Sequence, residues 1–261
     1  MALDMLPIPP PEMRALVGPT EVEAFENSSG DPVFPDCDTT GAVFDFGCGC
    51  GCGRIARQLI QQHTQPERYV GIDLHKGMIE WCSRNLAPAA PQFRFHHHDV
   101  FNAGFNPHAP SAFAEFPVSD AEFHLVLAHS VFTHITESAA TQYLSECRRV
   151  LRPNGRLRAT WFLFDKRYFP MMQSFQNALY INEHDVTNAV IFDKTWLTLA
   201  FEEAGFVMTA VQPPTVRGYH WTITAQPRLG PGRHFELPED SAPFGRVPPP
   251  VLTVPAYEVG S

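Results

Sequence analysis

The sequence has no uninterrupted apolar run close to the ~20 residues that a helix needs to cross a bilayer. Its opening residues, MALDMLPIPPPEMR, have neither the basic start nor the apolar region of a secretory signal. There are only 6 cysteines among 261 residues, so a disulfide framework is not expected. These absences predict a globular protein of the reducing cytoplasm, without insertion into a membrane.

Positive charge is also scarce, with 19 Lys and Arg against 28 Asp and Glu and a formal net charge of -9. Nucleic-acid binding relies on Lys and Arg that neutralise phosphates. The one strongly basic run, RRVLRPNGRLR at 148–158, is typical of the end of a helix, a turn and the start of a strand. We therefore expect no nucleic-acid partner, and the sequence leaves the oligomeric state open.

Proline is plentiful, with 25 residues, and it marks both ends of the chain. Residues 1–40 are interpreted as an N-terminal cap segment, and 227–261 as a disordered, proline-rich tail. The segment 41–226 between them is predicted to form one domain. Within it, 165–193 is an irregular insert that we expect on the side of the substrate.

Strand-like and helix-like patterns alternate along this domain. Apolar residues recur at helical spacing between the strands, as at Ile55, Leu59 and Ile60. Such alternation predicts an α/β fold, a doubly wound parallel sheet with helices on both faces. The seven expected strands are Ala42–Phe46, Tyr69–Asp73, Phe93–Asp99, Phe123–Ser130, Arg156–Phe164, Phe206–Val211 and Tyr219–Ala225.

The run FDFGCGCGCGR, at 44–54, puts glycine and cysteine in alternation between the first strand and the first helix. Zinc sites usually pair cysteines two to four residues apart and need four ligands, so Cys48, Cys50 and Cys52 fit a metal poorly. Glycines between a strand and a helix instead let backbone N–H groups approach a ligand. Asp73 ends the next strand, where an acid can bind a ribose. The pattern indicates a nucleotide-type cofactor, either a dinucleotide or S-adenosylmethionine.

Five motifs in order resemble those of the class I S-adenosylmethionine-dependent methyltransferases. They are VFDFGCGCG, YVGIDLHKGMIEWC, FHHHDVF, FHLVLAHSVFTHI and YLSECRRVLRPNGRL, and the likeness covers about 41–225. The resemblance implies a Rossmann-like sheet of seven strands, mostly parallel, with an antiparallel strand at the C-terminal end. It also implies S-adenosylmethionine as cofactor, S-adenosylhomocysteine as product and no metal.

The same resemblance implies roles for individual residues. Asp73 would bind the ribose, Asp99 would contact the adenine amino group, and Val100 would pack on the adenine ring. The cofactor set implied by the alignment is Asp45, Gly47, Cys48, Gly49, Gly51, Asp73, Leu74, Asp99, Val100 and His129. A second register, with Gly49, Gly51 and Gly53 as the three motif glycines, stays open.

Histidines that follow the fourth strand are candidates for chemistry, since ligands bind at the carboxyl ends of parallel strands. A hydroxyl acceptor must lose its proton during methylation, which calls for a base. His134 matches a position where several related methyltransferases carry a histidine near the acceptor, so it is the first candidate for the base, followed by His129. His184 and His220 are further candidates, and a metal at His96 and His98 is a weaker alternative.

Aromatic and methionine residues crowd the stretch 161–180, part of which could form a wall for an organic acceptor. PPPEMRALVG, EAFENSSGDPVF and the run ATWFLFD resemble segments of methyltransferases found with glycan and surface-polysaccharide synthesis. We therefore expect O-methylation of a sugar or a similar metabolite. Alternatives are N-methylation of a small amine, with Glu115, Asp120 or Glu183 attracting its charge, and a non-catalytic module that binds S-adenosylmethionine.

Overall fold

The computed structural model describes residues 6–18, 20–230, 235 and 237–239 of the chain. Its centre is a sheet in the strand order β3-β2-β1-β4-β5-β7-β6, with β8 and β9 joined to β5 through β9. The order reverses between β1 (Ala42–Phe46) and β4 (Phe123–Ala128), which both pair in parallel with their neighbours. A reversal of this kind leaves a crevice at the carboxyl ends of the strands.

The strands β1 to β5 are parallel, and their first members agree closely with the expected ranges. β2 runs over Arg68–Asp73 and β3 over Phe93–His97, with Phe44 opposite Val70 and Val70 opposite Arg94. β9 (Trp221–Pro227) pairs antiparallel with β5 (Leu151–Phe164) and with β8 (Phe206–Gln212). The predicted α/β fold, mostly parallel with an antiparallel C-terminal part, is confirmed.

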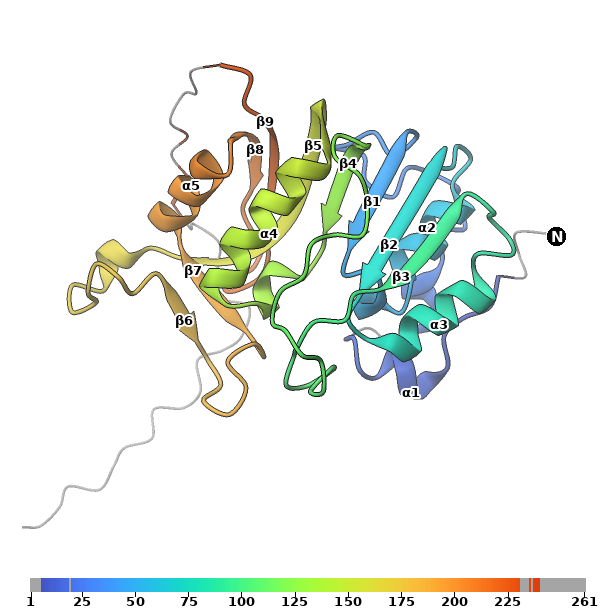
Figure 1. The fold of residues 1–261 in the computed structure, drawn as a ribbon, viewed down its shortest axis with the longest axis horizontal. Helices are drawn as coiled ribbons and strands as arrows, with labels where there is room; N and C mark the ends of the chain where they lie inside the picture. The colour runs from blue at the N-terminus through green and yellow to red at the C-terminus, as the bar shows by residue number, and fades with distance from the viewer. Residues whose placement is uncertain (1–5, 19, 231–234, 236, 240–261) are drawn as a thin grey trace, which may run out of the picture.

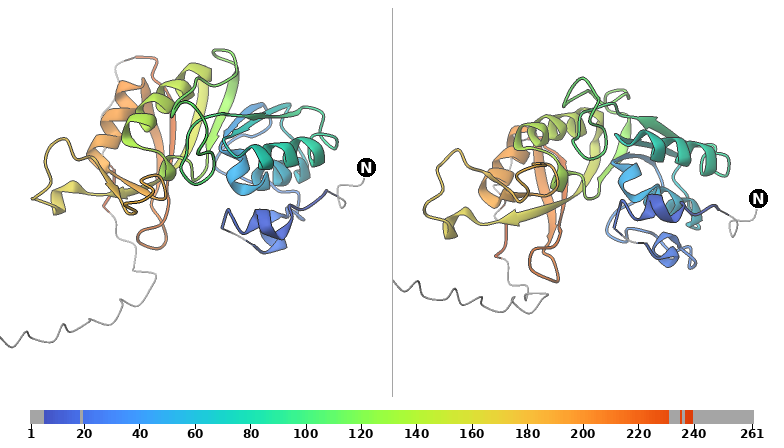
Figure 2. Two further views of the ribbon diagram at one scale, coloured as in Figure 1. Left: turned by 60° about the horizontal axis from the view of Figure 1, so that its bottom comes forward. Right: turned by 90° about the horizontal axis from the view of Figure 1, so that it is seen from below.

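Helices cover both faces of the sheet (Figures 1 and 2). Side chains of α2 (Arg54–Gln61) and α3 (Lys76–Asn85) pack in one core with Val43, Tyr69 and Leu125. Side chains of α4 (Glu137–Val150) and α5 (Lys194–Glu203) pack in another with Phe44, Val70 and Val126. Neighbouring strand residues alternate between the two cores, as the pleat of a sheet requires.

Several expected strand ends differ from the structure: β3 stops at His97 instead of Asp99, and β9 covers Trp221–Pro227 instead of Tyr219–Ala225. β4 stops at Ala128, because Ser130 has a φ of 58°, in the left-handed region that no strand residue adopts. β5 begins at Leu151 instead of Arg156, since the chain passes from α4 into the strand without a separate turn. The pairing of β5 with β4 then shifts register between Phe123 and Leu125.

The insert expected at 165–193 contains regular structure that the pattern did not reveal. It holds a short 3₁₀ turn, η5 (Lys166–Tyr168), and the strands β6 (Ala178–Tyr180) and β7 (Val190–Asp193). β7 pairs with the end of β5, and β6 forms the edge next to it. The sheet therefore has nine strands, and the insert extends away from its centre (Figure 1).

The N-terminal segment, with α1 (Pro11–Arg14) and η2 (Val22–Phe25), is tied to the domain through Arg57 of α2. Arg57 is 2% exposed and donates to the carbonyls of Leu6, Pro7 and Phe25. It also forms an ion pair with Glu26 at 2.9 Å. The segment therefore lies against the domain in a fixed place.

Most of the tail predicted to be disordered lies outside the described residues. In the part of the chain that the structure describes, no helix is long and apolar enough to span a membrane.

Candidate active site

A cavity of about 630 Å³ lies at the carboxyl ends of β1 to β4, where the strand order reverses. Most of its lining is apolar, and the N-terminal segment closes one side with Leu16, Val17 and Gly18. Cavities of this size and character hold cofactors and small organic substrates. The residues that line it at the strand ends are Phe46, Gly47, Cys48, Asp73, Leu74, His98, Val100, His129, Ser130 and Val131.

The glycine-rich loop leaves no room for larger residues at two positions. Gly47 has a φ of +90°, and a Cβ there would meet Val131 Cγ2 at 2.3 Å. Gly49 lies in the short turn η3 (Cys48–Gly51), where a Cβ would meet the carboxyl carbon of Asp73 at 2.6 Å. The loop backbone thus packs directly on the acid that follows β2. This close approach agrees with the prediction that the glycines let the loop backbone contact the cofactor.

Asp73 is 3% exposed and lines the cavity. One of its carboxylate oxygens accepts a hydrogen bond from the backbone N–H of His75 at 2.7 Å, which fixes the carboxylate at the cavity wall. Leu74 lines the cavity beside it, and its carbonyl accepts from His97 Nε2 at 3.0 Å. A fixed carboxylate at this strand end suits the hydroxyl pair of a ribose.

Asp45 lies beneath the loop and is not among the residues that line the cavity. The hydroxyl of Tyr69 donates to it at 2.6 Å. Burial raises the pKa of Asp45 to about 7, although the bond from Tyr69 acts in the opposite direction. In this position Asp45 ties β1 to β2, and its contact with the cofactor stays a prediction.

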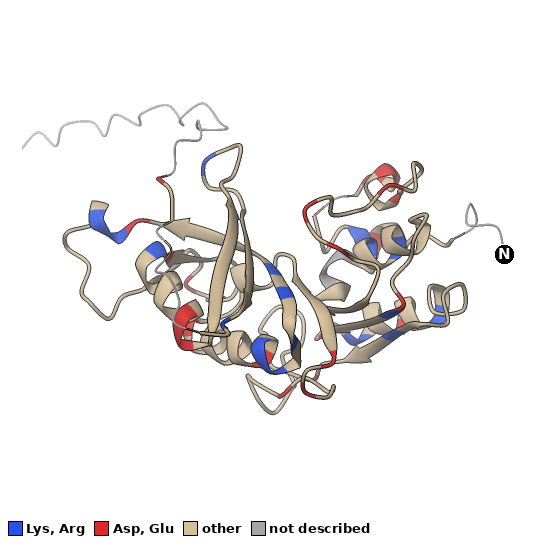
Figure 3. Cartoon of the chain, turned by 90° about the horizontal axis from the view of Figure 1, so that it is seen from above, with Lys and Arg blue, Asp and Glu red and all other residues tan. Residues whose placement is uncertain are grey.

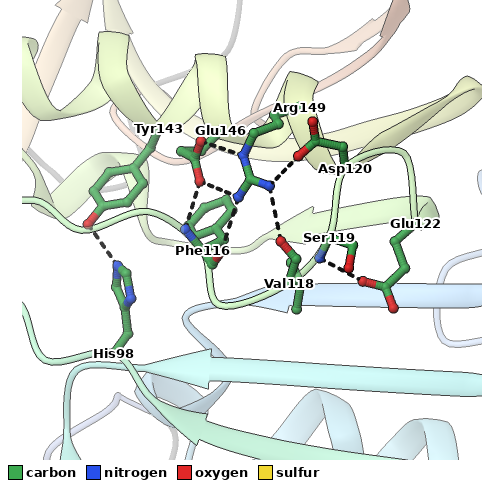
Figure 4. Close-up of polar contacts among 9 residues, drawn as sticks. All are labelled: His98, Phe116, Val118, Ser119, Asp120, Glu122, Tyr143, Glu146 and Arg149. Atoms are coloured by element: carbon green, nitrogen blue, oxygen red, sulfur yellow. Dashed lines mark hydrogen bonds and ion pairs between the residues drawn. The ribbon is translucent and has the colours of Figure 1, made fainter.

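The end of β3 brings His98 and Val100 into the cavity, whereas Asp99 between them is exposed and accepts from the Asn106 amide. His98 Nε2 lies 2.9 Å from the hydroxyl of Tyr143 on α4 (Figure 4). Burial lowers the pKa of His98 to about 4 and raises the pKa of Tyr143 to about 12, so both are neutral near pH 7. The pair places two polar groups in an apolar wall.

The loop that precedes β4 is fixed to α4 by Arg149 (Figure 4). This guanidinium pairs with Glu146 and Asp120 at 2.7 Å and donates to the carbonyls of Phe116 and Val118. Phe116 in turn stacks on Tyr143 with ring centroids 5.4 Å apart. The network therefore holds the Tyr143 side of the cavity in place.

His134 lies in the turn η4 (Phe132–His134) after β4, half-buried at the cavity wall. Its Nδ1 is 3.2 Å from the carbonyl oxygen of Thr187 in the insert. A carbonyl can only accept, so Nδ1 carries the proton in the neutral ring and Nε2 keeps its lone pair. Asn102 donates to Thr187 Oγ1 at 3.0 Å and thereby joins the insert to the loop after β3.

His129, at the end of β4, lines the same cavity. Burial lowers its pKa to about 4, and the charge of Arg54 acts in the same direction. Its Nδ1 is buried and has no hydrogen-bond partner among the described residues. A pKa this low makes His129 a weaker candidate for a base near pH 7 than the first candidate, His134.

His220, one of the further candidates for the base, also reaches the cavity, together with Ser130 and Arg54, to which the motifs gave no role. His220, from the segment before β9, stacks on Phe162 and lies with Nε2 3.3 Å from Ser130 Oγ. Ser130 is one of the few non-glycine residues with a positive φ, a strain typical of functional sites. Arg54 begins α2 directly after the glycine loop. The sequence held a signal for Ser130 and Arg54 too, since Ser130 lies within the fourth motif and Arg54 ends the glycine-rich run.

Cys52, in the loop, behaves as a packing residue and is fully buried. The Cys52 thiol donates to the Met13 carbonyl at 3.2 Å, and burial raises its pKa to about 12. In the described part of the chain no group of three or more His, Cys, Asp or Glu is placed to hold a metal ion. The weaker metal alternative at β3 fails for a separate reason, because His96 is exposed while His98 is buried.

Several other candidates lie away from the cavity. His184 is exposed beside Glu183, Asp120 pairs with Arg149, and Glu115 is exposed. The insert lines the cavity with Val186 and Thr187. Its aromatic and methionine residues, expected to form a wall, do not line it. The exposed ones are Tyr168, Phe169, Met171, Phe175 and Tyr180.

Charged residues of the described chain are interspersed in sign across the fold (Figure 3). Nucleic-acid binding usually uses Lys and Arg gathered on one face. That this protein has no nucleic-acid partner stays a prediction.

Residues 43–155 match a family model described as a methyltransferase domain. The fold is similar to a solved S-adenosylmethionine-dependent methyltransferase from Methanosarcina mazei, at 18% identity and a TM-score of 0.51, over 76% of this chain and 99% of that one. It is also similar to an O-methyltransferase from neocarzinostatin biosynthesis, at 14% identity and a TM-score of 0.51, over 74% of this chain and 51% of that one. A third similar fold is that of a [4+2]-cyclase, at 15% identity and a TM-score of 0.52, over 72% of this chain and 76% of that one.

The likeness to these structures shows a shared fold. The match to the methyltransferase domain spans the glycine loop, Asp73 and the ends of β1 to β4, which are the parts that form the cavity. Together they support a class I S-adenosylmethionine-dependent methyltransferase. The match to the methyltransferase domain identifies an enzyme. The motifs predicted S-adenosylmethionine as its cofactor, and this agrees with a similar fold that was solved with that molecule.

Proposed function

We propose that the enzyme methylates a hydroxyl group of a small organic acceptor, a sugar or a comparable hydroxylated metabolite. The observation that carries this proposal is the position of His134. Its Nδ1 is committed to the Thr187 carbonyl, and its ring borders the cavity. A neutral histidine oriented in this way can take a proton through Nε2.

When bound, S-adenosylmethionine supplies a methyl group that an oxygen or nitrogen lone pair can attack. The glycine loop and Asp73 would hold it, while Leu74 and Val100 give apolar contact. The protein's own contribution is to orient the acceptor, to exclude water and to remove the hydroxyl proton at His134 Nε2. Asn102 and Asp185 hold Thr187, which in turn holds the base.

A hydroxylated small molecule is consistent with the cavity and with one similar structure. The O-methyltransferase from neocarzinostatin biosynthesis was solved with S-adenosylmethionine and 2-hydroxy-5-methyl naphthoic acid. For the alternative, N-methylation of a cationic amine, the sequence offered Glu115, Asp120 and Glu183 as attracting acids. None of the three is among the residues that line the cavity, so O-methylation is the better supported reading.

His134→Asn tests the role of the base. An asparagine amide can still donate to the Thr187 carbonyl, but it cannot accept the acceptor's proton. We expect turnover to fall by about 10²- to 10⁴-fold, the usual contribution of a general base. The affinity for S-adenosylhomocysteine and the melting temperature should stay close to those of the unmodified enzyme.

The assay follows S-adenosylhomocysteine release over a panel of sugars, hydroxyaryl compounds and amines. His184→Asn is the matched control, because His184 is 89% exposed and outside the cavity. Activity confined to amines would contradict O-methylation. An unchanged rate in His134→Asn with a lowered melting temperature would show that His134 only supports the turn in which it lies.

A further inference from the structure

A second pocket of about 390 Å³ lies behind the main cavity. Arg54, Ile55 and His129 line both of them and therefore form the wall between them. The second pocket is also lined by the polar side chains of Asn27, Ser29 and Gln58 and by the acidic residues Glu26, which pairs with Arg57, and Asp31. The space open to a ligand thus continues from the main cavity into this second pocket.

Arg54 differs in its partners from Arg57 and Arg158, two other arginines with largely buried side chains. Arg57 pairs with Glu26, and Arg158 pairs with Asp36 at 3.0 Å. Arg54 has no ion pair with a described residue, and its buried Nε has no hydrogen-bond partner among them. Burial also lowers the pKa of Arg54, because the charged guanidinium loses contact with water there.

His129 adds a second buried polar atom to the same wall, and its Nδ1 is a donor in the tautomer that carries the proton there. Its Nδ1 is likewise without a partner in the described part of the chain. Leaving a buried charge and buried polar atoms unsatisfied costs free energy, so such groups usually face a ligand that satisfies them. A guanidinium beside an imidazole N–H matches the planar, two-oxygen shape of a carboxylate.

We propose that Arg54 and His129 bind a carboxylate of the methyl acceptor at this wall. The acceptor is then a hydroxylated carboxylic acid, such as a sugar acid or a hydroxyaryl acid. This inference rests on the proposed function, since it concerns the molecule whose hydroxyl is methylated.

A carboxylate is available from two sources, the acceptor and the amino-acid end of the cofactor. Two observations favour the acceptor. The ring of His129 lies 5.9 Å from that of His220, which contacts Ser130 and is one of the further candidates for the base. The second pocket also gives space beyond the wall for the rest of an acceptor.

The test uses the full-length protein saturated with S-adenosylhomocysteine and measures binding by calorimetry. Each acid is compared with its uncharged amide: glucuronate with glucuronamide, 4-hydroxybenzoate with 4-hydroxybenzamide, and salicylate with salicylamide. We expect at least one acid to bind about tenfold or more tightly than its amide, the scale of a hydrogen bond to a charged group. Arg54→Gln should remove this preference and Arg54→Lys should keep part of it. Arg84→Gln, an exposed arginine in the last turn of α3, should leave it unchanged.

A second arm separates the two sources of the carboxylate. It compares S-adenosylhomocysteine with 5′-methylthioadenosine, which lacks the amino-acid end. We expect Arg54→Gln to change both affinities by no more than about twofold. A loss for S-adenosylhomocysteine alone would assign Arg54 to the cofactor's carboxylate and overturn the proposal.

The proposal is also overturned if the unmodified protein prefers none of the acids, or if Arg54→Gln keeps the preference. Failure of the unmodified protein to bind S-adenosylhomocysteine at all would be a different result. It would refute the assignment as a methyltransferase before the acceptor came into question. Melting temperatures of the variants show whether each has folded.

Discussion

The most direct test of the cofactor site is Gly49→Ala, a change of one methyl group. Gly49 lies in the loop after β1, and its α-carbon faces the carboxylate of Asp73. A Cβ added there would lie 2.6 Å from the carboxyl carbon, 2.8 Å from Asp73 Cβ and 3.0 Å from Oδ1. All three distances are shorter than van der Waals contact, so either the loop or the carboxylate must move.

Asp73 has little freedom to move away. It is 3% exposed, and its Oδ1 accepts from the His75 N–H at 2.7 Å. Displacing the carboxylate would weaken the hydrogen bonds that we predict it to accept from the ribose, each worth about 1.5–3 kcal/mol because the acceptor is charged. The affinity for S-adenosylhomocysteine should fall roughly 10- to 100-fold. Overpacking of the loop should lower stability by about 1–3 kcal/mol, which leaves the protein folded.

Calorimetric titration with S-adenosylhomocysteine measures the affinity, and urea unfolding measures the stability. Gly104→Ala is the matched control, because a Cβ there would meet its nearest neighbours at 3.5 and 3.6 Å, ordinary contact distances. The control should bind like the unmodified enzyme. If Gly49→Ala also binds within about twofold, the loop does not hold Asp73 against the cofactor and the geometric argument is refuted.

Three further changes test other parts of the structure. Asp73→Ala should weaken S-adenosylhomocysteine binding by roughly 10- to 100-fold in the same titration, and unchanged affinity would exclude it as the ribose ligand. Arg57→Met should lower the free energy of unfolding by about 3–5 kcal/mol in urea, because it removes a buried charge that ties down the N-terminal segment. Burial raises the pKa of Asp45 from 3.8 to about 7, so the unfolded chain ionises first and stability falls as pH rises through this window. Asp45→Asn should remove this loss of stability. The low pKa values of His98 and His129 make stability rise with pH in both the unmodified protein and the variant. The difference in unfolding free energy between the two proteins, measured in urea across the pH range, therefore isolates the contribution of Asp45.

The order of strands and helices could be predicted from the sequence because the signals are local. Continuous apolar runs such as β2 and β4 indicate strands covered on both faces, and the stripe of α2 has the helical period. The two short strands of the insert were missed, since β6 and β7 are brief and separated by an irregular segment. β7 pairs with the end of β5 and β6 pairs only with β7, so both strands depend on contacts outside their own short sequences.

Motif positions likewise placed much of the cofactor site. Gly47, Asp73 and Val100 line the cavity, as their places at strand ends suggested. Asp99 and Asp45 do not, because the alternation of a strand places one in solvent and the other in the core. Sequence position determines which strand a residue ends, but not which way its side chain points once the strand has stopped.

The sequence by itself therefore indicated the class of the enzyme, its cofactor and the edge of the sheet where we expect the ligand to bind. These follow from short-range patterns in the chain, glycine spacing and the acid at the next strand end. Only the tertiary structure decided the rest of the cavity. It brought His220 to Ser130 and Thr187 to His134, and it set Arg54 and His129 in one wall. Such contacts join residues from 53 to 90 positions apart, and no local pattern records which distant groups will meet.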